Sequence, residues 1–212
     1  MRTQEMLNVK ELNKDVILNN VFGDFLTKFD TDIDGVVKHE ICDLTLIYRV
    51  KVDTADDDVI ASFIITDAIL EAAGLTEAEL FERVKASKNF TFKSIFETIA
   101  EYTGEAFDFS FCEGIPEEMM LYVITTESKM RGSFVVATDY MKEVREKLGK
   151  DLLVLPCSRH EIIVLRYNPT LEIDEIKNLV SFVNQSELRD EDFLSDSVYL
   201  YTENGLEIIE EA

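Results

Sequence analysis

Two short apolar runs in the second half of the chain constrain its fold most. "DLLVLP" at 151–156 and "EIIVLRY" at 161–167 each contain four successive apolar side chains. Apolar runs this short are typical of strands that are buried on both faces, in the middle of a sheet. Farther along, "VYLYTENGLEII" places Asn204 and Gly205 between two strand-like segments, which predicts a β-hairpin. The second half of the chain is therefore expected to contain a sheet.

The other periodic segments of this half predict two helices and two further strands. The strands are expected at 119–125 and 133–137, and the helices at 173–183 and at 141–148, which Gly149 closes. Gly114 and Pro116 interrupt the chain before them and suggest a boundary at Gly114. Residues 115–212 are thus predicted to form a lobe of ββαββα order followed by the hairpin.

Residues 1–114 are predicted to form an N-terminal lobe with a helix, a β-hairpin and three more helices. The expected segments are an entry helix from Val9 toward Phe25, strands at 43–52 and 59–66, and helices at 67–73, 76–86 and 92–102. Gly74 would end one helix, and Thr76 with Glu79 would cap the next. The expected fold is α+β, with two closely packed lobes that each hold a mainly antiparallel sheet with helices packed on it, or one continuous domain.

Composition and cysteine usage predict a cytoplasmic globular protein. A chain of 212 residues with 46% hydrophobic side chains can bury about 70% of its unfolded surface without a metal or a disulfide. Cys42, Cys112 and Cys157 are odd in number and lack CxxC spacing, which favours a reducing compartment. The first twenty residues carry several charges, unlike a signal peptide, and the longest apolar run, 59–65, is too short to span a bilayer.

The net charge restricts the partners that the protein can have. Lys and Arg number 21 and Asp and Glu number 43, so the formal charge is −22. This excess of carboxylates, which is spread over both halves of the chain, repels phosphate backbones and anionic lipids. We therefore expect no direct nucleic-acid binding and no membrane contact, and a protein with a basic surface is the favoured partner. The oligomeric state is left open.

"FDTDIDGVVKHEI" begins like a calcium-binding loop. Asp30, Asp32, Asp34 and Gly35 occupy the first three ligand positions and the glycine position of an EF-hand, but Ile41 stands where the bidentate glutamate belongs. An EF-hand also needs a helix after the loop, whereas the following residues alternate as in a strand. We interpret the aspartates as a polar turn, and they remain weak candidates for a metal site.

"PCSRHE" is the stretch that most resembles a catalytic site. It brings together Cys157, Ser158, His160 and Glu161, and a nucleophile needs a neighbouring base with an orienting partner. Groups this close on one strand rarely reach attack geometry, so Ser158, His160 and Glu161 are weak catalytic candidates. The alternative is a strand connection in which His160 forms a hydrogen bond to a neighbouring strand. Neither "HEICD" nor "HEIIV" completes HExxH, and we predict no cofactor.

Several longer stretches resemble one family. "LYVITTESKMRGSFVVATDYMKEVREKLGKDLLVLPCSRHEIIVL", "LSDSVYLYTENG", "DLTLIYRVKV" and "GLTEAELFERV" resemble an uncharacterised bacterial domain family common in gut Firmicutes, from about residue 39 to the C-terminus. The resemblance implies a fold and a bacterial cytoplasmic setting, and it transfers no activity. Members typically have a longer N-terminal region, a serine in place of Cys157 and an apolar residue in place of Arg159.

Three functions are therefore compared. The preferred one is a non-catalytic binding or regulatory module, for which we expect a flat or apolar exposed patch. The second is a hydrolase or transferase that uses carboxylates, with or without a divalent metal, between the lobes, and it predicts a pocket of converging carboxylates. The third is an acidic inhibitor that mimics nucleic acid, with carboxylates at phosphate spacing along one face.

Overall fold

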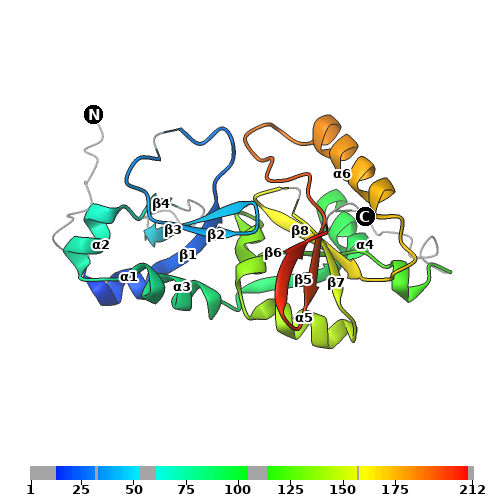
Figure 1. Ribbon diagram of the computed structural model, residues 1–212, viewed down its shortest axis with the longest axis horizontal. Helices are drawn as coiled ribbons and strands as arrows, with labels where there is room; N and C mark the ends of the chain where they lie inside the picture. The colour runs from blue at the N-terminus through cyan, green and yellow to red at the C-terminus, as the bar shows by residue number, and fades with distance from the viewer. Residues whose placement is uncertain (1–12, 32, 53–60, 105–113, 157, 210–212) are drawn as a thin grey trace.

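The computed structural model describes residues 13–31, 33–52, 61–104, 114–156 and 158–209. It confirms the α+β class, since two antiparallel sheets lie next to each other in an elongated molecule, with helices packed around them (Figure 1). The first sheet has four strands and the second has six. In the described part of the chain, no helix is both long and apolar enough to cross a membrane.

The first sheet is built around one long strand. Its strands are β1 (Val21–Phe25), β2 (Lys38–Ile41), β3 (Leu44–Val52) and β4 (Ala61–Ile64). β1 pairs with one edge of β3, while β2 and β4 share the other edge. The helices of this part are α1 (Lys14–Asn20), α2 (Asp67–Ala73) and α3 (Glu77–Lys85). The predicted left-handed cap at Gly74 and the capping box of Thr76 with Glu79 are both confirmed.

The expected entry helix is wrong over its last residues. The described helix ends at Asn20, and Val21–Phe25 form strand β1 instead. "VFGDF" consists mainly of aromatic and β-branched residues that suit a strand, and β1 gains a full set of ladder hydrogen bonds with β3. The apolar spacing from Val9 that suggested a helix begins in 1–12, outside the described residues.

The second sheet has the order β10-β9-β7-β8-β6-β5. Its strands are β5 (Phe90–Ser94), β6 (Tyr122–Thr126), β7 (Leu152–Leu155), β8 (Glu161–Arg166), β9 (Tyr199–Thr202) and β10 (Gly205–Ile208). The two apolar runs are β7 and β8, which lie in the middle as predicted, and β9 and β10 form the predicted hairpin. The helices here are α4 (Ile95–Thr103), α5 (Tyr140–Leu148) and α6 (Ile173–Glu187).

Three predicted segments of this part differ in the structure. The helix expected at 92–102 begins only at Ile95, after β5, because Ser94 and Glu97 form a capping box there. The strand expected at 133–137 is the 3-10 helix η4 (Gly132–Ala137), and the strand expected from 119 is preceded by the short helix η3 (Glu117–Met119). Phe90 and Phe92 fit either a strand or a helix face, and pairing with β6 decides for the strand.

One buried apolar cluster extends through both sheets. It includes Phe25 and Leu46 of the first sheet, Ile124 and Tyr199 of the second, and Val135 of η4 between them. A smaller cluster lies under α6. The lobe boundary at Gly114 remains a proposal, and β5, which precedes that glycine, already pairs with β6 of the second sheet. The two halves therefore share a core.

Candidate functional site

The candidate site lies where the two sheets meet, around a buried carboxylate. Asp24 of β1 has a fully buried side chain, and three guanidinium groups surround it. Arg159 Nη2 donates to Asp24 Oδ2 at 2.9 Å, Arg131 Nη1 donates to the same oxygen, and Arg49 Nη1 lies 3.8 Å from it. Arg159 also approaches Asp30, with 3.5 Å between Nη1 and Oδ2.

The register between strands β1 and β3 sets the positions of Asp24 and Arg49. Phe22 pairs with Arg49 across β1 and β3, and Asp24 lies two residues after Phe22. Since side chains alternate along a strand and paired residues share a face, Phe22, Asp24 and Arg49 all lie on one face of the first sheet. Ser62 of β4 fixes the guanidinium of Arg49, because Arg49 Nε donates to Ser62 Oγ at 3.0 Å.

The second half of the group is held by the turn before η4. Arg131 has a left-handed backbone with φ of 52°, a conformation that a side chain with a Cβ rarely adopts. Its N–H donates to His160 Nδ1 at 3.1 Å, and the next N–H, of Gly132, donates to the His160 carbonyl at 2.8 Å. These bonds direct the Arg131 side chain toward Asp24 of the other half.

Both ring nitrogens of His160 form contacts that hold the Arg131 turn in place. Its Nδ1 accepts from Arg131, and its Nε2 lies 2.8 Å from Asp192 Oδ1. The tautomer that satisfies both contacts carries the proton on Nε2. Burial by itself raises the pKa of Asp192, but hydrogen bonds from His160 and Arg189 lower it further than burial raises it. Both ring nitrogens are occupied, so the geometry gives His160 an orienting role toward Arg131.

The other predicted catalytic residues lie nearby without forming a nucleophile and base pair. The hydroxyl of Ser158 accepts from the His160 backbone N–H at 3.0 Å, rather than facing its ring. Glu161 begins β8, and burial raises the pKa of its carboxyl. Cys157 lies outside the described residues. In its described residues the stretch leads into β8, and the ring of His160 contacts the turn before η4 and Asp192 instead of the neighbouring strand that the sequence suggested.

Two of the predicted metal ligands, Asp30 and Asp34, lie among the described residues. Asp30 Oδ2 accepts from the Thr27 N–H at 2.7 Å and faces Arg159, whereas Asp34 is exposed and Asp32 lies outside the described residues. The chain continues into strand β2, as the alternation after the loop predicted. Within the described ranges, no three His, Cys, Asp or Glu side chains are grouped as a metal ion would require.

A cleft opens beside the buried carboxylate. It has a volume of about 650 Å³ and lies between β1, β3 and β4 of the first sheet and β5 with the turn before η4 of the second. Arg49, Lys51 and Arg131 line it, and Glu127 is the carboxylate among its described lining residues. Burial lowers the pKa of Arg49, and the Arg131 charge lowers it further, whereas Asp24 opposes the change. Among the described lining residues, three cations therefore face one carboxylate.

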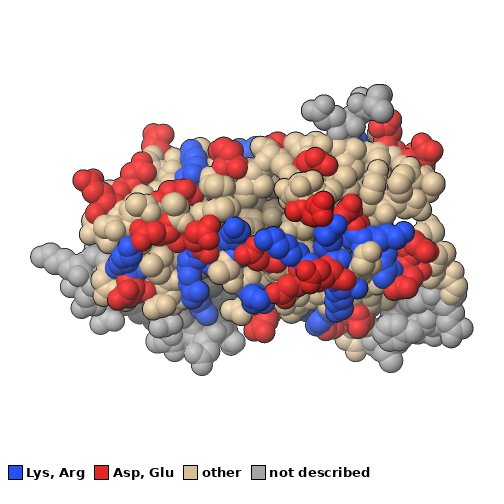
Figure 2. Space-filling view, turned by 60° about the horizontal axis from the view of Figure 1, so that its bottom comes forward, with Lys and Arg blue, Asp and Glu red and all other residues tan. Residues whose placement is uncertain are grey.

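Charges of both signs are mixed on the face of the molecule shown in Figure 2. Figure 2 shows one face of the molecule, on which Lys and Arg side chains alternate with Asp and Glu side chains instead of forming a field of one sign. Several exposed Lys side chains of the described chain form ion pairs, such as Lys88 with Glu143 at 2.5 Å. Carboxylates aligned as in a nucleic-acid mimic are not a feature of this face.

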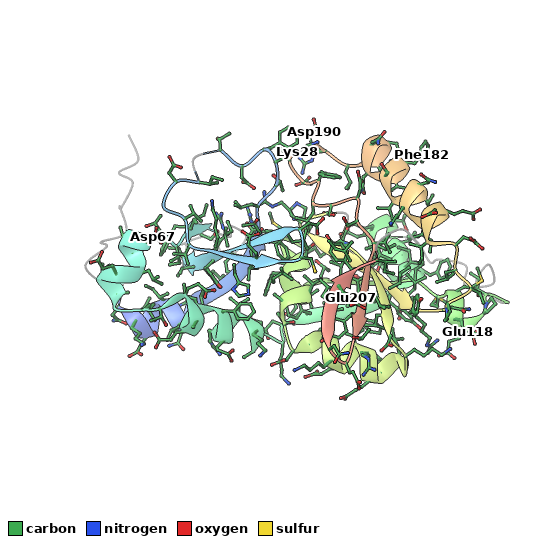
Figure 3. All side chains as sticks on the ribbon, in the orientation of Figure 1. Lys28, Asp67, Glu118, Phe182, Asp190 and Glu207 are labelled. Carbon is green, nitrogen blue, oxygen red and sulfur yellow. The ribbon has the colours of Figure 1, made fainter. Side chains whose placement is uncertain are left out.

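A second feature is the outer face of α6. Leu179, Phe182 and Val183 are 62%, 68% and 40% exposed, while Val180 on the opposite side is buried. Figure 3 shows Phe182 on the side of α6 that faces away from the sheet. Carboxylates stand at both ends of α6, Asp174 and Glu175 in its first turn and Glu187 at its last residue. The helix thus combines an exposed apolar face with acidic ends.

Asp24 and the three arginines around it, Arg49, Arg131 and Arg159, form a group that we call the arginine cluster. The sequence did not indicate it. Its members come from four separate segments, and 107 residues separate Asp24 from Arg131 while 135 separate it from Arg159. Local spacing carries no information on contacts of this range. The signal that existed was a single aspartate within the apolar segment "VFGDF", since an acidic residue at a buried strand position needs a charged partner.

Comparison with known proteins identifies a family but no activity. A family model described as "Family of unknown function (DUF5688)" matches residues 31–203. No curated protein and no solved structure matches the chain. The match includes strands β2 to β9 with Arg49, Arg131 and Arg159, whereas β1 with Asp24 precedes it and β10 follows it.

Proposed function

Because the chain belongs to the DUF5688 family, whose function is unknown, we propose a function from the geometry of the cleft. The protein is a non-catalytic binding module that takes an anionic ligand between its two sheets. The observation that carries this proposal is the convergence of Arg49 and Arg131 on the cleft. Asp24 draws both guanidinium groups together from opposite halves of the protein.

Two cations of the cleft, Arg131 and Lys51, remain available to a ligand. Arg131 reaches Asp24 through Nη1, and 27% of its side chain is still exposed. Lys51 is exposed on the same strand as Arg49. The guanidinium group offers several N–H donors in a fixed plane that matches a carboxylate or a phosphate, so a second anion can bind at the donors that Asp24 does not use. The binding energy comes from charges that folding has already brought together.

Titration with pyrophosphate, followed by calorimetry, tests this proposal. We expect saturable binding to the wild-type protein and at least a tenfold loss for Arg131→Gln, because a charge-assisted hydrogen bond contributes about 1.5–3 kcal/mol. Lys51→Gln, at an exposed position, should weaken binding less and keep the fold. Lys150→Ala is the matched control, since Lys150 is exposed and does not line the cleft. Equal binding by Arg131→Gln and Lys150→Ala would contradict the proposal.

The face of α6 supports a second function, the binding of a protein. Its exposed side chains, Leu179 and Phe182 above all, form an apolar patch of the type that marks a protein contact. The carboxylates at both ends of α6 favour a partner whose apolar groove is bordered by Lys and Arg. This is the basic protein partner that the net charge already favoured.

Capture from a bacterial lysate at low and high salt, read by mass spectrometry, tests this second function. We expect the wild-type protein to capture a specific partner protein at low salt and to lose most of that capture at high salt. The double substitution of Leu179 and Phe182 by Ser should abolish the capture. The matched control replaces the exposed Met119, at 62% exposure, by Ser. A partner retained by the α6 variant but lost from the Met119 variant would contradict a role for α6.

A further inference from the structure

The cleft has an apolar side as well as a cationic one. Phe22 of β1, Phe90 of β5 and Phe134 of η4 line it together with the cations. Their ring centroids lie 6.4 Å apart for Phe22 and Phe134 and 5.1 Å apart for Phe90 and Phe134, both in tilted arrangements. Phe134 is buried between the two other rings, which are half-buried. The cleft is therefore lined by aromatic rings from both sheets, which are packed together through Phe134.

From these two sides we infer that the ligand is a phosphate ester that carries a planar aromatic ring, and a nucleoside monophosphate is its simplest biological form. This inference rests on the proposed function and specifies the ligand of the same cleft. The phosphate would bind Arg49, Lys51 and Arg131, and the ring would pack against Phe22 and Phe90.

Strand register sets the spacing between these two kinds of contact. Phe22 and Arg49 are direct partners across β1 and β3, so their Cβ atoms are about 4.5–5.5 Å apart on the same face. A ligand that contacts both must hold an apolar ring close to its anionic group, with a short polar unit between them. A nucleoside phosphate has this construction, with a sugar between base and phosphate, whereas inorganic phosphate uses the cationic side alone.

Polar side chains complete the lining where a base or a sugar would need partners. Asn19, Asn89 and Ser128 line the same cleft and offer amide and hydroxyl groups. Such groups bind the donor and acceptor atoms on the edges of bases and sugars. The volume of about 650 Å³ lies within the range of about 300–1,000 Å³ that is usual for small-molecule sites. A free nucleotide therefore fits the chemistry of the cleft.

A polymeric nucleic acid fits much less well. The net charge of −22 repels a long phosphate backbone over the whole surface, while a monophosphate presents its charge only inside the cleft. Binding of single nucleotides is thus compatible with the expectation that the protein does not bind nucleic acid directly.

The experiment compares four probes, GMP, CMP, guanosine and inorganic phosphate, by calorimetry and by ligand-detected NMR. We expect GMP or CMP to bind about tenfold or more tightly than inorganic phosphate, because stacking on an aromatic side chain strengthens binding by about that factor or more. Phe22→Leu and Phe90→Leu should each reduce this advantage and leave phosphate binding unchanged. Phe92→Leu is the matched control, since Phe92 is a half-buried ring on β5 outside this cleft.

The possible outcomes separate this inference from the proposed function. If both nucleotides and inorganic phosphate bind with equal affinity, the aromatic ring is not recognised, so the inference is wrong and the anion site stands. If guanosine binds as tightly as GMP, or if no probe binds while pyrophosphate does, the inference also fails. If no anion binds at all, both proposals fail. Should Phe22→Leu not fold, Phe90→Leu provides the same comparison from the other half of the cleft.

Discussion

The imidazole of His160 and the carboxylate of Asp192 are joined at 2.8 Å between Nε2 and Oδ1. This contact fixes the ring so that Nδ1 accepts the N–H of Arg131, whose backbone has a left-handed φ of 52°. Asp192 therefore acts on the arginine cluster through His160. The orientation of one cation of the cleft depends on a carboxylate of a different loop.

The substitution Asp192→Asn should lower the free energy of unfolding at neutral pH. This difference from the wild type should shrink in acid. Hydrogen bonds from His160 and Arg189 outweigh burial and keep the pKa of Asp192 below its ordinary value. A carboxylate with a lowered folded-state pKa stabilises the protein above the unfolded pKa of about 3.9, and the contribution is lost as pH falls through the folded-state pKa. We expect a loss of about 1 kcal/mol at pH 7 that shrinks toward pH 3.

Urea denaturation at pH 7 and at pH 3 measures this difference. Asp190→Asn serves as the control because Asp190 is exposed on the same loop (Figure 3). It should leave the free energy of unfolding within about 0.5 kcal/mol of the wild type at both pH values. A difference for Asp192→Asn that is equal at pH 7 and pH 3 would show that the lost contact is not ionic.

Asp24→Asn should destabilise the protein and at the same time tighten anion binding. The fully buried carboxylate accepts from Arg131 and Arg159, and removal of one side of a buried ionic group costs about 3–5 kcal/mol. The variant leaves the guanidinium groups without their anion, so pyrophosphate should bind more tightly and recover part of the lost stability. Urea denaturation with and without pyrophosphate measures both effects.

The control for Asp24→Asn is Asp151→Asn. Asp151 also pairs with an arginine, at 2.7 Å from Arg145 Nε, but its side chain is 38% exposed. An exposed ion pair contributes about 0–1 kcal/mol, so this variant should be nearly neutral and should not change pyrophosphate binding. Similar losses for the two variants would contradict a special role for the buried carboxylate.

Gly132→Ala should be strongly destabilising. A Cβ at this position would lie 2.6 Å from the His160 carbonyl oxygen and 2.7 Å from Thr125 Cα, and both are backbone atoms that cannot rotate away. Overpacking of this kind costs about 1–3 kcal/mol or more. In Gly104→Ala the new Cβ meets nothing within 4 Å, although φ is +65°, so about 1 kcal/mol is expected. Thermal denaturation should rank the two variants in this order.

Calcium should bind no more tightly than millimolar. Asp30 accepts from Thr27 and faces Arg159 at 3.5 Å, so a cation at this carboxylate would have to displace a guanidinium group. Calorimetric titration with calcium measures this directly. A micromolar isotherm that Asp32→Ala abolishes would contradict the interpretation of this loop as a polar turn.

Features set by neighbouring residues were predictable from the sequence. The capping box of Thr76 with Glu79, the cap at Gly74 and the turn between β9 and β10 each depend on side chains within a few positions. The apolar runs of β7 and β8 were also recognisable, because a short segment without polar alternation must be covered on both faces. Local chemistry was sufficient for these elements.

The features that were missed depend on distant contacts. Val21–Phe25 and Phe90–Ser94 are strands because they pair with β3 and β6, respectively. A local sequence pattern does not identify the strand with which a segment will pair. Residues 133–137 are rich in the aromatic and β-branched side chains that are common in strands, yet Gly132 is held against β6 and the His160 carbonyl, where η4 begins. The arginine cluster has the same origin, since its four residues meet only after both sheets have formed.

The sharing of Asp24 between the two sheets also bears on how this protein can change in evolution. Its carboxylate belongs to the first half, two of its counterions belong to the second, and the apolar interior passes between them without a break. Either half alone would expose unpaired charges at a surface that is buried in the intact protein. Recombination that exchanges or duplicates a single half should therefore yield insoluble chains.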